Sequence, residues 1–165
     1  MQRVLLMRHG IAEDAGPGQR DSERALTDPG RRRVEAVATD LAATVGPVDR
    51  MVSSDYLRAI QTADILARHL QPGQREISTG LVPHGDPASV YDWLGALPDA
   101  PVTVLVGHEP QMNLLLGVGL TGTPWGPARF GKASVAMLAF QGGISAGRGQ
   151  LELFLRAGLG VRSRE

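Results

Sequence analysis

Short β-type runs alternate with helical patterns along this chain of 165 residues, and this alternation constrains the fold more than any other feature. The clearest strand is VTVLVG (102–107), a continuous apolar run rich in β-branched residues, as is typical of strands buried on both faces of a parallel sheet. RVLLM (3–7) is a similar run near the start of the chain. Because parallel strands need long crossover connections, usually helices, the pattern predicts a three-layer α/β/α sandwich around a mostly parallel sheet.

The period of the apolar residues and the turn signals predict the other elements. We expect helices over 29–44, 55–70, 87–97 and 110–120, and strands over 49–54 and 75–79. Asp28 and Asp55 are the expected caps of the first two helices. The polar segment 11–30 contains glycine and proline and is expected to be mostly loop. SVAMLAF (134–140) and QLELFLR (150–156) flank a Gly-rich turn, which predicts an antiparallel hairpin at one edge of the sheet.

Length and composition favour one soluble globular domain over 1–156, followed by a C-terminal tail over 157–165. Lys and Arg number 17, as do Asp and Glu, so bulk positive charge does not favour binding to nucleic acid. The absence of cysteine excludes disulfides and thiol nucleophiles. The apolar run before Arg8 is too short for a signal peptide, and no run has the length of a membrane span, so we expect a cytoplasmic protein with no membrane partner.

Three predicted strands are followed by side chains that suit phosphate binding. In chain order these are Arg8 with His9, Ser53 and Ser54 with Arg58, and His108 after Gly107. Ligands of open α/β sheets bind outside the carboxyl ends of the strands, so we expect the three groups to converge there. We expect Gly10 to let the backbone turn after the first strand, and Gly107 to allow a close backbone approach.

Two imidazoles and two guanidiniums around one crevice describe a site for a phosphoryl group. One imidazole can attack phosphorus, while the arginines and the second imidazole stabilise charge on the equatorial oxygens. Arg58 lies in the first turn of a predicted helix, where unpaired amides also favour phosphate. Taken singly, Arg58 could instead be a solvated partner of Asp55, and His108 a structural histidine. The four histidines show no metal-ligand spacing, and neighbouring arginines would repel a cation, so we expect no metal.

The segments LLMRHG, RALTDPG, SSDYLRAIQTA and LVGHEP, in this order, resemble the histidine phosphatase superfamily, which includes the phosphoglycerate mutases. The resemblance covers residues 1–155, and the short chain looks most like the SixA-type phosphohistidine phosphatases. It implies a phosphoglycerate mutase-like fold, no cofactor, and His9 as the nucleophile that becomes phosphorylated. Arg8, Arg58 and His108 would complete the phosphate pocket.

One position departs from the family pattern. Mutases and general phosphatases carry a glutamate general acid after the third strand, where this chain has Gly80. A phosphohistidine substrate tolerates this loss, because its P–N bond is labile and imidazole is a better leaving group than an alkoxide. The leading hypothesis is therefore a metal-independent phosphatase that acts on phosphohistidine in a partner protein. A small-molecule phosphomonoesterase that uses His84 or Asp86 as the acid, and a non-catalytic phosphoprotein-binding module, are the alternatives.

Overall fold

In the computed structural model, which describes residues 1–157, six strands form one sheet in the order β3-β2-β4-β1-β5-β6. The strands are β1 (Gln2–Arg8), β2 (Arg50–Ser54), β3 (Gln74–Ser78), β4 (Val102–Gly107), β5 (Val135–Phe140) and β6 (Gly149–Leu155). β3, β2, β4 and β1 pair in parallel, and β5 runs antiparallel to both β1 and β6. The predicted parallel sheet with an antiparallel edge is confirmed.

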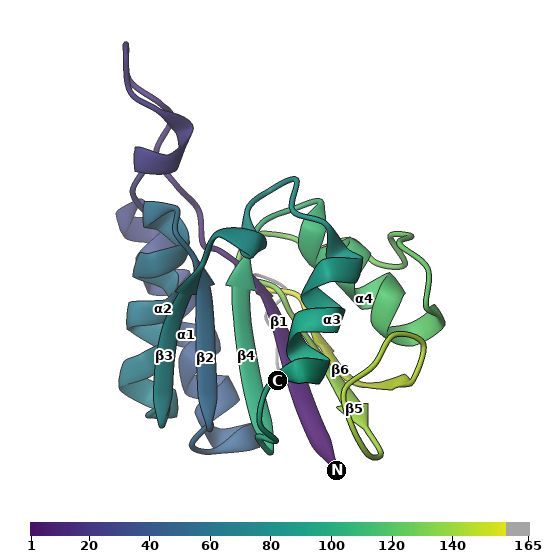
Figure 1. The fold of residues 1–165 in the computed structure, drawn as a ribbon. Coiled ribbons are helices and arrows are strands. Elements are labelled where there is room, and N and C mark those ends of the chain that lie inside the picture. Colours follow the sequence, from purple (N-terminus) through teal and green to yellow (C-terminus); the bar gives the residue numbers. More distant parts are fainter. Residues whose placement is uncertain (158–165) are drawn as a thin grey trace, which may run out of the picture.

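Helices cover both faces of the sheet (Figure 1). They are α1 (Asp28–Val45), α2 (Leu57–Leu70), α3 (Pro87–Ala96) and α4 (Gln111–Thr121). The side chains of β1 alternate between two cores: Leu5 and Met7 pack with α1 and α2, whereas Val4 and Leu6 pack with α3 and α4. This period of two lets one continuous apolar strand serve both layers. The three-layer sandwich is therefore confirmed.

The two predicted helix caps are wrong by one residue. Thr27, not Asp28, is the N-cap of α1, and its Oγ1 accepts a hydrogen bond from the backbone N–H of Gly30 at 2.9 Å. α2 begins after Tyr56 and has no side-chain cap, so Asp55 does not cap it. Ser54 lies beside the start of α2 and its hydroxyl accepts from the N–H of Tyr56 instead.

The segment expected to be loop forms an ordered arm, residues 12–26, which projects beyond the sheet near α2 (Figure 1). An antiparallel bridge joins Ala12 to Leu26, and the N–H of Glu13 donates to the carbonyl of Ala25 at 2.8 Å. A short 3-10 helix, η1 (Asp21–Glu23), lies on the returning half of the arm. The arm thus brings the residues of η1 back toward the body of the protein.

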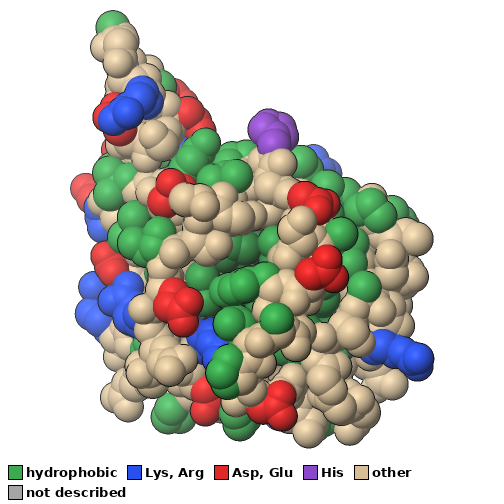
Figure 2. Space-filling model, viewed as in Figure 1, with side chains coloured by type: hydrophobic (Ala, Val, Ile, Leu, Met, Phe, Trp, Pro, Cys, Tyr) green, Lys and Arg blue, Asp and Glu red, His purple; other side chains and the backbone are tan. Residues whose placement is uncertain are grey.

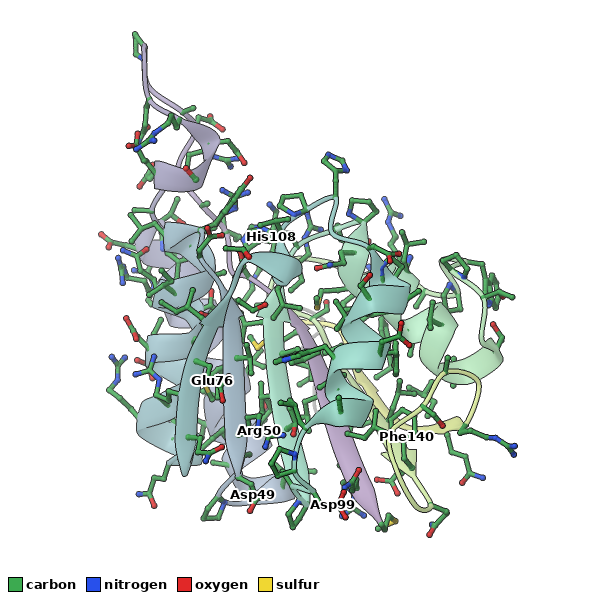
Figure 3. The ribbon with its side chains drawn as sticks, in the orientation of Figure 1. Asp49, Arg50, Glu76, Asp99, His108 and Phe140 are labelled. Atoms are coloured by element: carbon green, nitrogen blue, oxygen red, sulfur yellow. The ribbon has the colours of Figure 1, made fainter. Side chains whose placement is uncertain are left out.

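A cavity of about 680 Å³ opens beside β2 and β3, on the side of the sheet that carries α3. Figure 2 shows this face hollowed next to α3. Arg50, Glu76 and Asp99 line the cavity and are labelled in Figure 3 together with His108. Arg50 begins β2, whereas His108 follows the last residue of β4, so this cavity is separate from the crevice at the carboxyl ends of the strands.

Two sequence expectations concern the ends and the surroundings of the chain. The tail expected over 157–165 lies, beyond Ala157, outside the described residues. Among the helices of residues 1–157, none is both long and apolar enough to cross a membrane.

Candidate active site

His9 lies immediately after β1, and its backbone is fixed from two sides. Its N–H donates to the carbonyl of Gly107 at 2.9 Å, and its own carbonyl accepts from the N–H of Ala133 at 3.1 Å. The next residue, Gly10, is not in the left-handed region, so the expected role as a turn residue is not the reason for it. A Cβ at this position would lie 2.7 Å from Cγ2 of Val34, so close packing against α1 requires the glycine.

Two hydrogen bonds define the tautomer of His9. Its Nδ1 lies 2.6 Å from the carbonyl oxygen of Gly10, which can only accept, so Nδ1 carries the hydrogen. Its Nε2 lies 3.2 Å from Nε of Arg58, and the guanidinium can only donate. The Nε2 lone pair is therefore unprotonated and faces a cation, as a nucleophile for phosphorus requires.

Both site histidines are neutral at physiological pH. Burial lowers the pKa of His9 to about 2, and the charges of Lys132 and Arg58 also lower it. Burial lowers the pKa of His108 to about 3, with the charge of Arg58 next in importance. As whole residues, His9 is 3% exposed and His108 is 1% exposed, so burial is the main cause of both low pKa values.

His108 lies beside His9, with their ring centroids 5.0 Å apart. Its Nε2 is 2.8 Å from the hydroxyl oxygen of Ser54. That oxygen accepts from the N–H of Tyr56, and the hydroxyl can donate its own hydrogen to Nε2 of His108. This arrangement would place the hydrogen of His108 on Nδ1, which is buried and has no partner among residues 1–157. His108 thus has one ring N–H without a hydrogen-bond partner in the described part of the chain.

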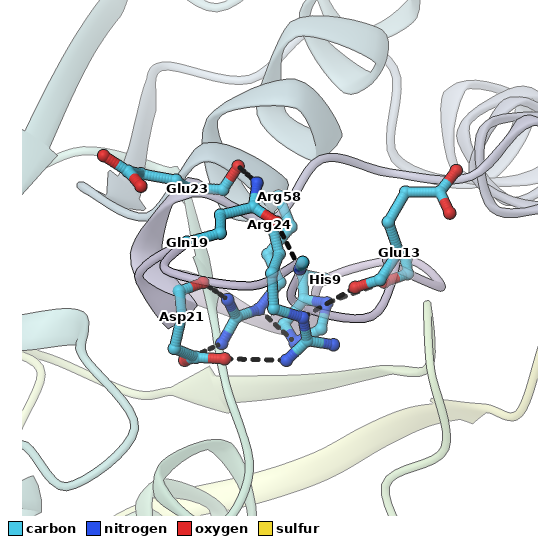
Figure 4. A network of polar contacts seen from close by, with 9 residues as sticks. His9, Glu13, Gln19, Asp21, Glu23, Arg24 and Arg58 are labelled. Atoms are coloured by element: carbon cyan, nitrogen blue, oxygen red, sulfur yellow. Dashed lines mark hydrogen bonds and ion pairs between the residues drawn. The ribbon is translucent and has the colours of Figure 1, made fainter.

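Arg58 is buried in the first turn of α2, and its side chain is 5% exposed. The proposed partner Asp55 is wrong: the guanidinium donates to Asp21 of the arm, through Nη1 to the carbonyl at 2.7 Å and through Nη2 to the carboxylate at 2.9 Å. Figure 4 shows this network joining the arm to Arg58 and His9. Thr62, one turn further along α2, accepts from the N–H of Gly10 at 3.1 Å and so ties this helix to the segment that follows His9.

Arg8 and Lys132 form the side of the crevice next to β5. Nη1 of Arg8 donates to the carbonyl of Phe130 at 2.8 Å, and its backbone N–H donates to the carbonyl of Ser134 at 3.1 Å. Lys132 belongs to the turn held by these bonds, and motif analysis did not identify it. Burial and, after it, the charges of Arg8 and other arginines lower its pKa to about 8. Its half-buried position beside Arg8, which only the tertiary structure shows, identifies Lys132 as a residue of the crevice.

Neither of the suggested acids joins this cluster. Asp86 is the N-cap of α3, and hydrogen bonds from Ser89 and backbone amides hold its pKa below the ordinary value, which favours the ionised form. His84 is exposed on the loop before α3 and makes no hydrogen bond to the crevice residues within residues 1–157. Glu109, next to His108, is a half-buried carboxyl whose pKa is raised by burial, and sequence analysis missed it. The structure therefore brings together Arg8, His9, Arg58 and His108 as predicted, but not His84 or Asp86.

The chain matches known proteins along most of its length. The model of the histidine phosphatase superfamily (branch 1) matches residues 4–83. The phosphohistidine phosphatase SixA of Escherichia coli is 32% identical over 117 residues, which cover 69% of this chain and 71% of SixA. A human mitochondrial serine/threonine-protein phosphatase is 34% identical over 102 residues, which cover 62% of this chain and 32% of that protein.

The fold agrees with this similarity. A structure of the protein histidine phosphatase SixA complexed with tungstate superposes with a TM-score of 0.82 and 27% identity, covering 94% of this chain and 97% of SixA. These similarities in sequence and fold support a phosphatase. The chain belongs to the histidine phosphatase superfamily.

Proposed function

We propose that this protein removes phosphate from phosphohistidine in a partner protein, without a metal ion, through a phosphorylated His9. The observation that carries the proposal is the state of His9. It is buried and neutral, its Nε2 lone pair accepts from Arg58, and His108 lies 5.0 Å away between ring centroids. A nucleophile between fixed cationic and neutral donors suits attack on a phosphoryl group.

The reaction has two displacements at phosphorus. His9 Nε2 forms a bond to phosphorus as the P–N bond to the substrate imidazole breaks, and the leaving imidazole takes up a proton. Water then attacks the phosphorus of phospho-His9, the P–N bond to Nε2 breaks, inorganic phosphate leaves, and the Nε2 lone pair is restored. The attacking water releases a proton to solvent, which balances the proton that the leaving imidazole takes up from solvent in the first step. Arg8, Arg58 and His108 stabilise the charge on the equatorial oxygens in both steps.

Three features support phosphohistidine as the substrate class. Gly80 stands where the family carries its glutamate acid, and Asp86 is held ionised as a helix cap, so an alkoxide leaving group would lack a proton donor from these positions. A labile P–N bond needs less help. The SixA relatives are named for this activity.

In residues 1–157, no group of three or more histidine, aspartate or glutamate side chains is placed to hold a metal.

The test compares wild type, His9→Ala and His69→Ala, where His69 is a surface histidine paired with Glu35 and serves as the control. Phosphate release is measured from a histidine-phosphorylated phosphotransfer domain and from a panel of sugar phosphates, with and without chelator. We expect wild type and His69→Ala to act on the phosphoprotein alone, and His9→Ala to be inactive. Hydrolysis of sugar phosphates without phosphoprotein turnover would favour the phosphomonoesterase alternative.

The phosphorylated residue is found by mass spectrometry of rapidly quenched enzyme kept at alkaline pH, where phosphohistidine survives. We expect the phosphoryl group on His9. A phosphoryl group on His108 or His84 would overturn the assignment, and equal, negligible phosphate release from wild type and His9→Ala would favour a binding module.

A further inference from the structure

Asp21 accepts four hydrogen bonds from two arginines, three of them from guanidinium nitrogens and one from the backbone N–H of Arg24. Its carbonyl and its Oδ2 accept from Nη1 and Nη2 of Arg58, at 2.7 and 2.9 Å. Its Oδ1 accepts from Nη1 of Arg24 at 2.7 Å, so one carboxylate bridges two guanidiniums (Figure 4). The Asp21 side chain is 54% exposed, whereas the Arg58 side chain is only 5% exposed. An accessible residue of the arm thus holds a buried residue of the crevice.

The geometry of the guanidinium gives this contact a consequence. Arg carries five N–H donors in a rigid plane, with one pair at the end of the group and another pair along the side that includes Nε. Asp21 occupies the end pair through Nη1 and Nη2. The side that carries Nε then faces His9, with its Nε–H donating to His9 Nε2 at 3.2 Å.

We infer that Asp21 is a positioning residue: it grips the end of the Arg58 guanidinium and turns the Nε side of that group toward the phosphoryl group that His9 will carry. The inference rests on the proposed function, and it names the residue that orients Arg58 within that site. When a phosphoryl group occupies the space at His9 Nε2, the Arg58 Nε–H transfers its hydrogen bond from the imidazole to a phosphoryl oxygen.

The surroundings of Arg58 explain why a carboxylate is needed here. The charges of Arg8, Arg24 and Arg58 all lower the pKa of Lys132, so these cations share one neighbourhood. Asp21 is the carboxylate that pairs with Arg58 within residues 1–157. Hydrogen bonds from Arg24 and Arg58 lower the pKa of Asp21, which keeps it ionised. A neutral side chain would leave the guanidinium among like charges without its paired carboxylate, and of the two Asp21 contacts with Arg58 only the one to the backbone carbonyl does not depend on the side chain.

A competing role for Asp21 is an internal anion that blocks the phosphate site. The geometry disfavours this role, because Asp21 binds Nη1 and Nη2 of the guanidinium and leaves the Nε–H directed at His9 Nε2. The two roles make opposite predictions: loss of a positioning residue weakens phosphoryl transfer, whereas loss of a blocking anion strengthens phosphate binding.

The first experiment follows the Arg58 Nε–H by nitrogen-15 NMR in the ligand-free protein. Asp21→Asn keeps the shape of the side chain but removes its charge and replaces one of its two acceptor oxygens with an NH2 donor, so the Oδ1 contact with Arg24 and the Oδ2 contact with Arg58 cannot both be kept in this geometry. We expect a slowly exchanging Arg58 Nε–H signal in wild type and its loss in Asp21→Asn. Glu23→Gln is the matched control, since Glu23 lies in the same 3-10 helix and pairs only with Arg20 at the surface within residues 1–157. An unchanged signal in Asp21→Asn would overturn the inference.

The second experiment measures formation of phosphoenzyme with phosphoramidate, a simple P–N phosphoryl donor, and inhibition by inorganic phosphate. We expect Asp21→Asn to form phosphoenzyme on the order of 10- to 100-fold more slowly, as a misplaced catalytic group does. Asp21→Glu should recover part of the rate because it restores the charge, and Glu23→Gln should match wild type. Tighter inhibition by phosphate in Asp21→Asn would instead identify a blocking anion.

The two experiments separate the inference from the proposed function. If wild type forms no phosphoenzyme, the proposed function fails, while the NMR signal still reports on Asp21 and Arg58. If wild type forms phosphoenzyme on His9 and Asp21→Asn does so at the same rate, only the role of Asp21 is overturned. Asp21→Ser provides a second neutral variant in case the asparagine variant does not fold.

Discussion

The two buried site histidines should make the stability of the protein depend strongly on mildly acidic pH. In the unfolded chain each histidine has an ordinary pKa of 6.5, whereas burial holds the folded values at about 2 for His9 and about 3 for His108. Between those values the unfolded chain binds protons that the folded protein does not. Stability is therefore fully present above pH 6.5 and is lost as the pH falls below it.

The magnitude follows from the same values. A change from pH 7 to pH 5 favours the unfolded chain by about 2 kcal/mol for each histidine, and by about 4 kcal/mol for the pair. This is a large part of a typical unfolding free energy of about 5–15 kcal/mol. Asp21 and Glu35 also have lowered pKa values, but carboxylates titrate mainly below pH 5 and are shared by the variants compared.

Urea unfolding of wild type and of the His9→Gln/His108→Gln double variant, at pH 7 and pH 5, measures the effect. We expect wild type to lose about 4 kcal/mol more than the double variant between these pH values, because glutamine does not titrate. His84→Gln is the control, since it removes an exposed histidine that lies outside the crevice. Equal losses in wild type and the double variant would show that these imidazoles are not held neutral, and the reasoning about the nucleophile would fail with them.

Three further outcomes are expected. Lys132→Met should slow phosphoenzyme formation. Lys132→Arg should preserve the charge and shift the alkaline limb of the pH–rate profile from about pH 8 to higher pH. An alkaline limb at the same pH in Lys132→Arg would exclude Lys132 as the group that titrates there. His84→Gln should leave phosphohistidine turnover unchanged, and a loss on the order of 100-fold in a turnover assay would restore His84 as the acid. Thr62→Val removes the acceptor for the N–H of Gly10 and should lower the free energy of unfolding by about 1–3 kcal/mol in urea titration, whereas no change would mean that water replaces the hydroxyl.

The sequence by itself predicts the α/β architecture and four residues of the site. The continuous apolar runs of β1 and β4 are local signals, because a strand with apolar side chains on both faces is typical of a sheet that is covered on both faces. Arg8, His9 and His108 could be placed together because each follows a predicted parallel strand, and parallel strands end at one edge of the sheet. Their convergence could be predicted without knowing the conformation of the loops.

Tertiary structure alone decides the partners of those residues. The sequence suggested Asp55 for Arg58, since it is near in the chain, but Asp21 comes from the arm, 37 residues away. Lys132 reaches the crevice only because hydrogen bonds fix the turn before β5 against Arg8 and His9. Asp86 was a candidate acid from its position in the sequence, but in the structure its carboxylate caps the start of α3. The local pattern of apolar residues determines which faces of a strand its side chains bury. A loop conformation depends on contacts between distant segments, and no local pattern encodes those contacts.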